Sequence, residues 1–201
     1  MQRFPFLTPN FRRALYVVAF ALLVSASAYA AKVFKHSAVH FTKKSPQQVE
    51  KILRDYANYC EEGCKYSRPG LQKVQLLKYK RSDTSWYTWT HVASTFKDVK
   101  YFTHVTIKRN PDHSFSWLSQ QVTDEKLIAK LEKLTGKPHS PIFDDGVTRI
   151  TVEKDKKGSK FTQNVSITIS GFISNFSSKI YSSMKKSFEA TFKKSQRTRG
   201  F

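Results

Sequence analysis

The residues that could carry acid–base chemistry gather between positions 139 and 149. Asp144 and Asp145 are adjacent, His139 precedes them, and Arg149 follows them. A carboxylate or an imidazole that faces a pocket can transfer protons as a general acid or base. Asp-Asp-Gly is also an ordinary turn sequence before a strand, and we favour this interpretation. The sequence has no nucleophile elbow, phosphate-binding glycine loop or zinc-helix motif, so we predict no catalytic residue.

Two histidines could form a second kind of site. If Lys97 and Asp98 make a two-residue turn, His91 and His104 lie opposite each other across a β-hairpin. Paired imidazoles can bind a metal or respond to pH. Two separate surface histidines are the simpler interpretation, and we predict neither a metal site nor a cofactor.

The two cysteines lie in the sequence Cys-Glu-Glu-Gly-Cys, at Cys60 and Cys64. Metal binding would need two more soft ligands nearby, and redox motifs have two intervening residues instead of three. Outside the cytosol, cysteines this close most often form a local disulfide, and Gly63 allows the short loop to bend. We therefore predict a structural disulfide between Cys60 and Cys64.

The first thirty residues have the composition of a targeting segment. Basic residues come first, an apolar run covers residues 14–24, and Ala28-Tyr29-Ala30 matches the small-residue pattern of a cleavage site. The apolar run is shorter than the roughly 20 residues that a membrane-spanning helix needs. We predict a signal peptide over residues 1–30, cleavage near Ala30, and a periplasmic or secreted protein. An uncleaved membrane anchor is the alternative.

The chain is strongly basic, with 35 Lys and Arg against 15 Asp and Glu and a formal net charge of +20. In a cytosolic protein this excess would indicate nucleic acid, but an exported protein meets anionic phospholipid head groups instead. The aromatic residues Trp86, Tyr87 and Trp89 could lie at a head-group interface or in a core. We predict an anionic membrane surface as a partner and no nucleic acid; a merely solubilising basic surface is the alternative.

Most of the chain between residues 32 and 122 is predicted to be strand. Lys32–Thr42 has the composition of a first strand. Ser45-Pro46-Gln47-Gln48 is a capping box with proline at the first helical position, and apolar residues at helical spacing extend this helix to Cys60. The antiparallel strands expected next are residues 71–80, 85–95, 99–108 and 114–122. A short helix follows at Thr123–Leu134, before Gly136.

The last part of the chain predicts a hairpin that leads into a long helix. Residues 161–170 alternate between apolar and polar side chains, with Gln163 the one exception, so one face of this strand should be buried. The turn Asp155–Gly158 joins it to a strand over Gly146–Lys154. Apolar residues then recur every four positions along Ser174–Lys194, which predicts an amphipathic helix.

This pattern resembles the START-like superfamily, which is also called the polyketide-cyclase and lipid-transport superfamily. The stretches that carry the resemblance are Ser45–Tyr59, Pro69-Gly-Leu71, Gly146–Val152 paired with Lys160–Ile169, and Ser174–Lys194. It implies an α+β helix-grip fold over residues 31–195, in which a curved antiparallel sheet wraps around the C-terminal helix. Residues 196–201 are then a basic tail.

The resemblance also implies a hydrophobic or lipid-like ligand, held in a cavity between the sheet and the C-terminal helix. The lining residues that it implies are Tyr101, Thr103, Val105, Ile107, Gln163, Val165, Ile167, Phe176, Ile180, Met184 and Phe188. The same residues could instead pack solidly and leave no cavity. The alternative functions are an enzyme of the polyketide cyclase/dehydratase type that uses the same cavity, and a basic structural protein that binds the envelope surface without a ligand.

Overall fold

The computed structural model describes residues 31–60, 63–64, 66–67, 70–93 and 98–170. The predicted signal peptide, the predicted helix over Ser174–Lys194 and the basic tail lie outside the described residues. Four of the predicted lining residues belong to that helix and also lie outside the described residues: Phe176, Ile180, Met184 and Phe188. Within the described ranges, no helix has both the length and the apolar character to cross a membrane.

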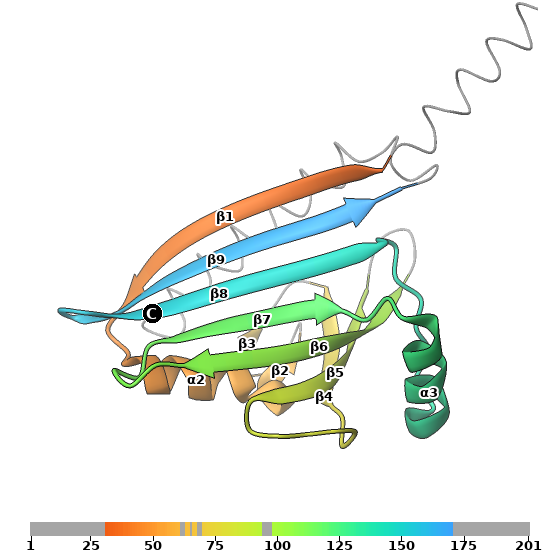
Figure 1. Cartoon of the computed structure of the whole chain (residues 1–201), viewed down its shortest axis with the longest axis horizontal. Coiled ribbons are helices and arrows are strands. Elements are labelled where there is room, and N and C mark those ends of the chain that lie inside the picture. Colours follow the sequence, from red (N-terminus) through yellow and green to blue (C-terminus); the bar gives the residue numbers. More distant parts are fainter. Residues whose placement is uncertain (1–30, 61–62, 65, 68–69, 94–97, 171–201) are drawn as a thin grey trace, which may run out of the picture.

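The fold is α+β and is built on one seven-stranded sheet, in which every neighbouring pair is antiparallel. Its strand order is β1-β9-β8-β7-β6-β5-β4 (Figure 1). The strands are β1 Lys32–Thr42, β4 Leu71–Leu76, β5 Ser85–Val92, β6 Val99–Arg109, β7 Phe115–Gln121, β8 Asp145–Asp155 and β9 Gly158–Ile169. Consecutive strands from β4 to β9 are neighbours, so this part of the sheet is a meander of the antiparallel strands that were predicted. Strand β1 is an edge strand beside β9.

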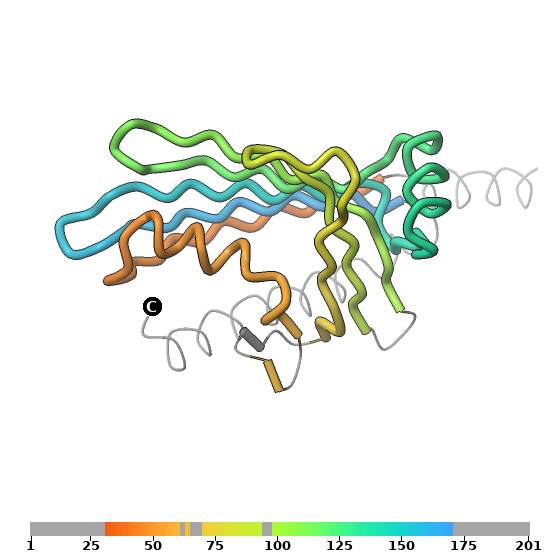
Figure 2. Tube along the Cα trace, turned by 90° about the horizontal axis from the view of Figure 1, so that it is seen from below, coloured from red at the N-terminus to blue at the C-terminus, as the bar shows by residue number. Residues whose placement is uncertain are grey.

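The sheet is strongly curved. The strands β4, β5 and β6 bend out of the plane of β8 and β9, toward the side on which helix α2 lies (Figure 2). Because successive side chains of a strand point to opposite faces, the register defines two faces. We call the face with Trp86, Val105 and Ile150, on which α2 packs, the inner face, and the opposite one the outer face.

Helix α2 spans Pro46–Arg54 and begins as predicted. The Ser45 side chain accepts a hydrogen bond from the Gln48 backbone N–H, and the Gln48 side chain accepts one from the Ser45 backbone N–H. The prediction that this helix reaches Cys60 was wrong. At Asp55 the backbone leaves the helical conformation (ψ 56°), and a short 3-10 helix, η1 Tyr56–Asn58, follows. The Asn58 amide donates to the Asp55 carboxylate (2.8 Å), which stabilises the turn instead of another helical turn.

The main core lies between α2 and the inner face. Val49 of α2 packs against buried side chains from β5 to β8, and Leu53 and Tyr56 extend the contact. The buried sheet residues in this cluster are Trp86, Val105, Ile107, Phe115, Trp117, Ile150 and Val152. The rings of Trp86 and Trp117 meet edge to face, with centroids 5.1 Å apart. This core fixes α2 across one half of the inner face.

Helix α3, Glu125–Thr135, packs on the outer face at the β4–β6 end of the sheet. The Asp124 side chain caps its first turn, and Gly136 ends it in the left-handed conformation (φ 63°). A second core cluster under this helix consists of Leu77, Trp89, Phe102, Val122 and Leu131. Leu134, in the last turn of this helix, is outside the cluster and exposed.

The register of the β5–β6 hairpin differs from the one that would pair His91 with His104. Val92 pairs with Val99, so six residues connect the strands instead of two. In this register His91 lies opposite Lys100, and His104 lies opposite Tyr87. The His104 ring stacks on the Tyr87 ring, with centroids 4.6 Å apart. The two histidines are therefore not cross-strand partners.

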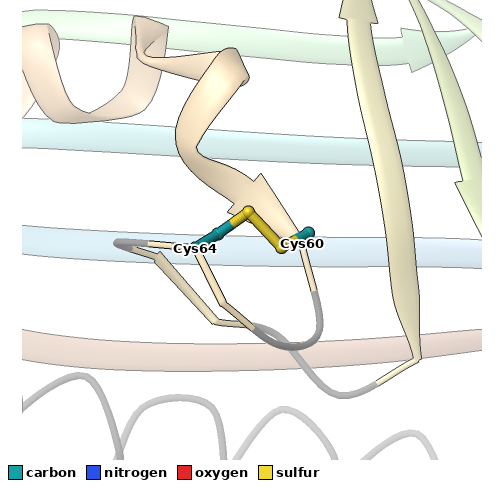
Figure 3. The surroundings of a disulfide bond; sticks show 2 residues. All are labelled: Cys60 and Cys64. Atoms are coloured by element: carbon teal, nitrogen blue, oxygen red, sulfur yellow. A yellow bond between two sulfur atoms is a disulfide. The ribbon is translucent and has the colours of Figure 1, made fainter.

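Cys60 and Cys64 form a disulfide, as predicted (Figure 3). Their Cα atoms are 5.6 Å apart. Cys60 ends β2, Tyr59–Cys60, which pairs in parallel with β3, Tyr66–Ser67. The disulfide thus closes a small loop between the two strands of this minor sheet.

Candidate functional site

The described residues of the predicted lining all lie on the inner face of the sheet. They are Tyr101, Thr103, Val105 and Ile107 on β6, and Gln163, Val165 and Ile167 on β9. The register shows this, because one row of paired residues runs across the sheet from Val105 through Ser119 and Thr148 to Val165. The alternation in the sequence therefore grouped residues of both strands that share one face of the sheet. The side chains of this face form three groups.

One part is a packed core. Val105 and Ile107 belong to the cluster beneath α2, where Val49 and Trp86 are also buried. The indole N–H of Trp86 donates to the Tyr56 hydroxyl (2.9 Å), which satisfies the one polar atom of that indole. At this end of the face, residues predicted to line a cavity contribute to the packing instead.

A second part is an apolar patch on β9. Val165, Ile167 and Ile169 form a buried cluster, against which Phe34 and Phe143 pack. Tyr101 reaches the same patch, because its ring meets the Phe143 ring edge to face at 5.2 Å between centroids. We call these residues the β9 patch.

Next to the core, on β5, β6 and β7, polar side chains are buried on the same face. Thr88, Thr103 and Gln121 occupy one row across β5, β6 and β7, and Thr90 lies beside them. We call these four residues the polar row. Buried polar groups in a protein are normally hydrogen-bonded, so a row of them on a sheet face needs an explanation.

Gln121 is the most informative member of the polar row. Its side-chain N–H donates to the Phe143 backbone carbonyl (3.3 Å), and the residue is only 5% exposed. Its other polar atom, the carbonyl oxygen Oε1, is buried and accepts no hydrogen bond in the described part of the chain. A Cβ on Gly146 would lie 3.6 Å from this oxygen and 3.0 Å from the Phe143 ring, so the glycine leaves room for both. Sequence reasoning missed Gln121. It stands at the same alternating positions of β7 as the apolar residues Phe115 and Trp117, and this spacing could have revealed its burial.

The imidazoles of the inner face come from β1. His36 pairs with Val165 and His40 with Phe161, which places both rings on this face. Burial lowers the pKa of His40, and the nearby His36 lowers it further. On the described strands, no Asp or Glu side chain belongs to the inner face. Across the described ranges, no three His, Cys, Asp or Glu side chains gather in a way that could hold a metal ion.

The residues first considered for acid–base chemistry lie elsewhere. Asp145 and Arg149 occupy outer-face positions of β8. The His139 ring stacks on Phe102 of the outer face, with centroids 5.7 Å apart. The structure therefore does not bring these three residues together with the polar row.

Trp86 and Trp89 are core residues and not head-group anchors. Both are buried, on the inner and the outer face respectively. The indole N–H of Trp89 donates to the Pro138 carbonyl (2.9 Å). Of the predicted aromatic cluster, Tyr87 alone is partly exposed, and it is stacked on His104.

Comparison with known proteins supports the fold but gives no sequence relative. No family model matches the chain, and no curated protein matches it in sequence. The solved structure of a STAR-related lipid transfer protein from Xanthomonas axonopodis is similar, with 19% identity, a TM-score of 0.50, and 69% of this chain and 70% of that chain covered.

Two further structures agree. Human STARD10 is similar with 10% identity and a TM-score of 0.50, covering 97% of this chain and 84% of that chain. A protein from Thermus thermophilus is similar with 9% identity and a TM-score of 0.53, covering 83% of this chain and 96% of that chain. At these identities the likeness concerns the backbone arrangement alone. The chain therefore has the START-like fold that its sequence pattern predicted.

Proposed function

We propose that this protein binds a hydrophobic or lipid-like molecule on the inner face, across the β9 patch and the polar row. The observation that carries the proposal is the buried Oε1 of Gln121, which has no hydrogen-bond partner among the residues that the structure describes. A buried acceptor without a hydrogen bond costs about 1–3 kcal/mol, so a ligand that donates to it would gain that free energy.

The arrangement fits an amphiphile. Val165, Ile167 and Phe143 offer apolar surface for a hydrocarbon chain, and Gln121 offers a single acceptor for a hydroxyl or amide group. Binding sites for such molecules are mostly apolar with a few polar groups that fix orientation. Phe176, Ile180, Met184 and Phe188 remain predicted as the cover of this face, on the C-terminal helix.

A fluorescent fatty-acid displacement assay on the purified full chain, with native mass spectrometry, tests the proposal. The variant Gln121→Met keeps the size of the side chain and removes its carboxamide. We expect it to weaken binding of a hydroxylated amphiphile about tenfold, the loss expected for one buried hydrogen bond. Gln120→Met is the matched control, because Gln120 is the neighbouring glutamine and is exposed on the outer face.

Two results would contradict the proposal. One is a full chain that carries no lipid and takes up no probe. The other is an equal effect of Gln121→Met and Gln120→Met on binding. In either case the inner face would be a solid core, and the burial of Gln121 would have no functional meaning.

A polyketide-cyclase type of enzyme is the second candidate, and the position of His36 is the observation that favours it. His36 is a partly buried imidazole on the inner face, beside Val165 of the β9 patch. An enzyme of this type needs an acid–base group at the ligand. Chemical conversion of a bound polyketide analogue that His36→Gln abolishes would favour the enzyme. Binding of the analogue without chemical conversion would favour the ligand-binding function over the enzyme.

Export through the predicted signal peptide is part of the proposal. The Cys60–Cys64 disulfide supports it, because disulfides persist in oxidising compartments outside the cytosol. The mass of the protein recovered from its native compartment tests it. A chain that begins near Ala31 is expected, and a chain that retains residues 1–30 would contradict it.

A further inference from the structure

Lysines gather at one end of the sheet, where the β8–β9 hairpin lies beside the end of β1. We call this region the lysine tip. It comprises Lys43, Lys44, Lys154, Lys156, Lys157 and Lys160, with Glu153 and Asp155 as its acids. The Lys160 ammonium pairs with Glu153 (3.1 Å), and most of the other lysines are exposed. Figure 1 shows the hairpin at the left end of the molecule, with α3 at the right end.

The backbone holds these lysines together. A Cβ on Gly158 would lie 2.0 Å from the Thr42 carbonyl oxygen and 2.7 Å from Lys43 Cα, so the hairpin and residues 42–43 approach as closely as a glycine permits. The buried Ser159 hydroxyl donates to the Lys44 carbonyl (2.7 Å). Like charges fixed this close together repel one another, and an external polyanion would relieve the repulsion.

Two exposed apolar side chains of β1, Val39 and Phe41, lie next to the lysine tip. Of the four large apolar side chains that stand exposed in the described part of the chain, three are Val33, Val39 and Phe41 on β1. All three belong to the outer face, and Phe41, which is 62% exposed, pairs with Lys160 of β9. Val39 and Phe41 lie at the end of β1 beside the lysines, whereas Val33 lies toward the other end, where it pairs with Thr168. Exposed apolar side chains next to lysines match the chemistry of a bilayer interface.

We propose that the lysine tip and the outer-face residues Val39 and Phe41 bind the surface of an anionic phospholipid membrane. The lysines attract the phosphate and carboxylate groups of the lipids, and the two apolar side chains insert at the level of the head groups. A nucleic acid would satisfy the lysines but would offer no apolar layer to the aliphatic Val39. The surface is on the outer face, so this proposal does not depend on ligand binding to the inner face.

A local fluorescent reporter tests insertion directly in the full chain. Phe41→Trp places an indole in the proposed surface, and Leu134→Trp places one at an equally exposed position (59%) on α3. Trp86, Trp89 and Trp117 are buried, so their emission should change little. We expect the emission of Phe41→Trp to shift to the blue with vesicles of phosphatidylcholine and phosphatidylserine, but not with phosphatidylcholine alone. Leu134→Trp should show no shift with either.

A charge comparison tests the electrostatic part. Lys156→Gln with Lys157→Gln should lower the partition coefficient onto anionic vesicles about thirtyfold, since each lysine near the surface contributes about 1 kcal/mol. Lys126→Gln with Lys130→Gln removes the same charge from exposed positions on α3 and should change binding less than about twofold. Equal losses in both pairs would overturn the proposal. An unshifted Phe41→Trp spectrum with anionic vesicles would also overturn it. If Lys156→Gln with Lys157→Gln then lowered the affinity for an RNA duplex, the lysine tip would bind nucleic acid instead of a membrane.

Discussion

Gly158 and Thr42 lie so close that a methyl group on the glycine would be 2.0 Å from the threonine carbonyl oxygen. The backbone of Gly158 also has a φ of +147°, which side-chain-bearing residues rarely adopt. We expect Gly158→Ala to lower the free energy of unfolding by more than about 2 kcal/mol, because strain and a backbone clash combine. Urea denaturation measures the change.

Gly136→Ala separates the two causes. Gly136 also has a positive φ (63°), but nothing lies within 4 Å of the position that its Cβ would take. This control should lose only about 1 kcal/mol, the cost of the left-handed conformation for alanine. If Gly158→Ala is no more destabilised than Gly136→Ala, the hairpin is not held against residues 42–43 as the structure shows.

Glu50 of α2 and Arg109 of β6 form a bidentate ion pair. The Arg109 Nη2 and Nε atoms lie 2.6 and 2.9 Å from the two carboxylate oxygens of Glu50. Burial alone would raise the pKa of Glu50, but the hydrogen bonds and charge of Arg109, with the charge of Arg54, outweigh it and lower that pKa. Glu50→Gln should therefore destabilise the protein at neutral pH by about 1–3 kcal/mol.

The pH dependence of this pair has a definite sign. The pKa of Glu50 is lower in the folded than in the unfolded chain, so its contribution is present above the ordinary value of 4.5. This contribution is lost as the pH falls through the folded pKa. The difference in the free energy of unfolding between the native chain and Glu50→Gln should therefore become smaller in that pH range. Asp83→Asn is the control: Asp83 also contacts Arg109 (2.7 Å), but its side chain is 75% exposed and should contribute less than about 1 kcal/mol. A deficit of Glu50→Gln that persists in acid would contradict the assignment.

The sequence could predict the strands whose two faces differ most in polarity. The bounds of β1 match the prediction, and β9 buries Val165, Ile167 and Ile169 as the alternation requires. The start of α2 could also be predicted, because a capping box is a local interaction within four residues. These features depend on neighbours in the sequence, which explains why the strands and the start of α2 could be predicted.

Features that depend on distant contacts were not predicted. The β5–β6 connection contains no glycine turn that fixes its length, so the register of His91 and His104 could not be deduced. The helical spacing continued past Arg54 to Cys60, but η1 and β2 occupy those positions. Gln121 lies within the predicted strand 114–122, but the sequence does not show which distant group its side chain contacts. Its side chain is held by the backbone carbonyl of Phe143, which is 22 residues away in the sequence.

His139 accepts a hydrogen bond from the backbone N–H of Phe102 through Nδ1 (3.2 Å) and stacks on the Phe102 ring. Burial lowers the pKa of His139, although the charge of Glu132 acts in the opposite direction. A histidine whose pKa is lower in the folded chain binds a proton more readily when unfolded. The protein should therefore lose stability as the pH falls below the ordinary value of 6.5.

His139→Asn tests this contribution, because asparagine keeps an acceptor near Nδ1 but does not titrate. Urea denaturation at about pH 7.5 and about pH 5.5 should show a smaller pH-dependent loss for His139→Asn than for the native chain. Some loss should remain, since burial also lowers the pKa of His104 and of His40. His113→Asn is the matched control at an exposed turn position with φ 67°, which asparagine tolerates, and it should keep the native pH dependence. Equal pH dependence in His139→Asn and His113→Asn would show that protonation of His139 does not oppose folding.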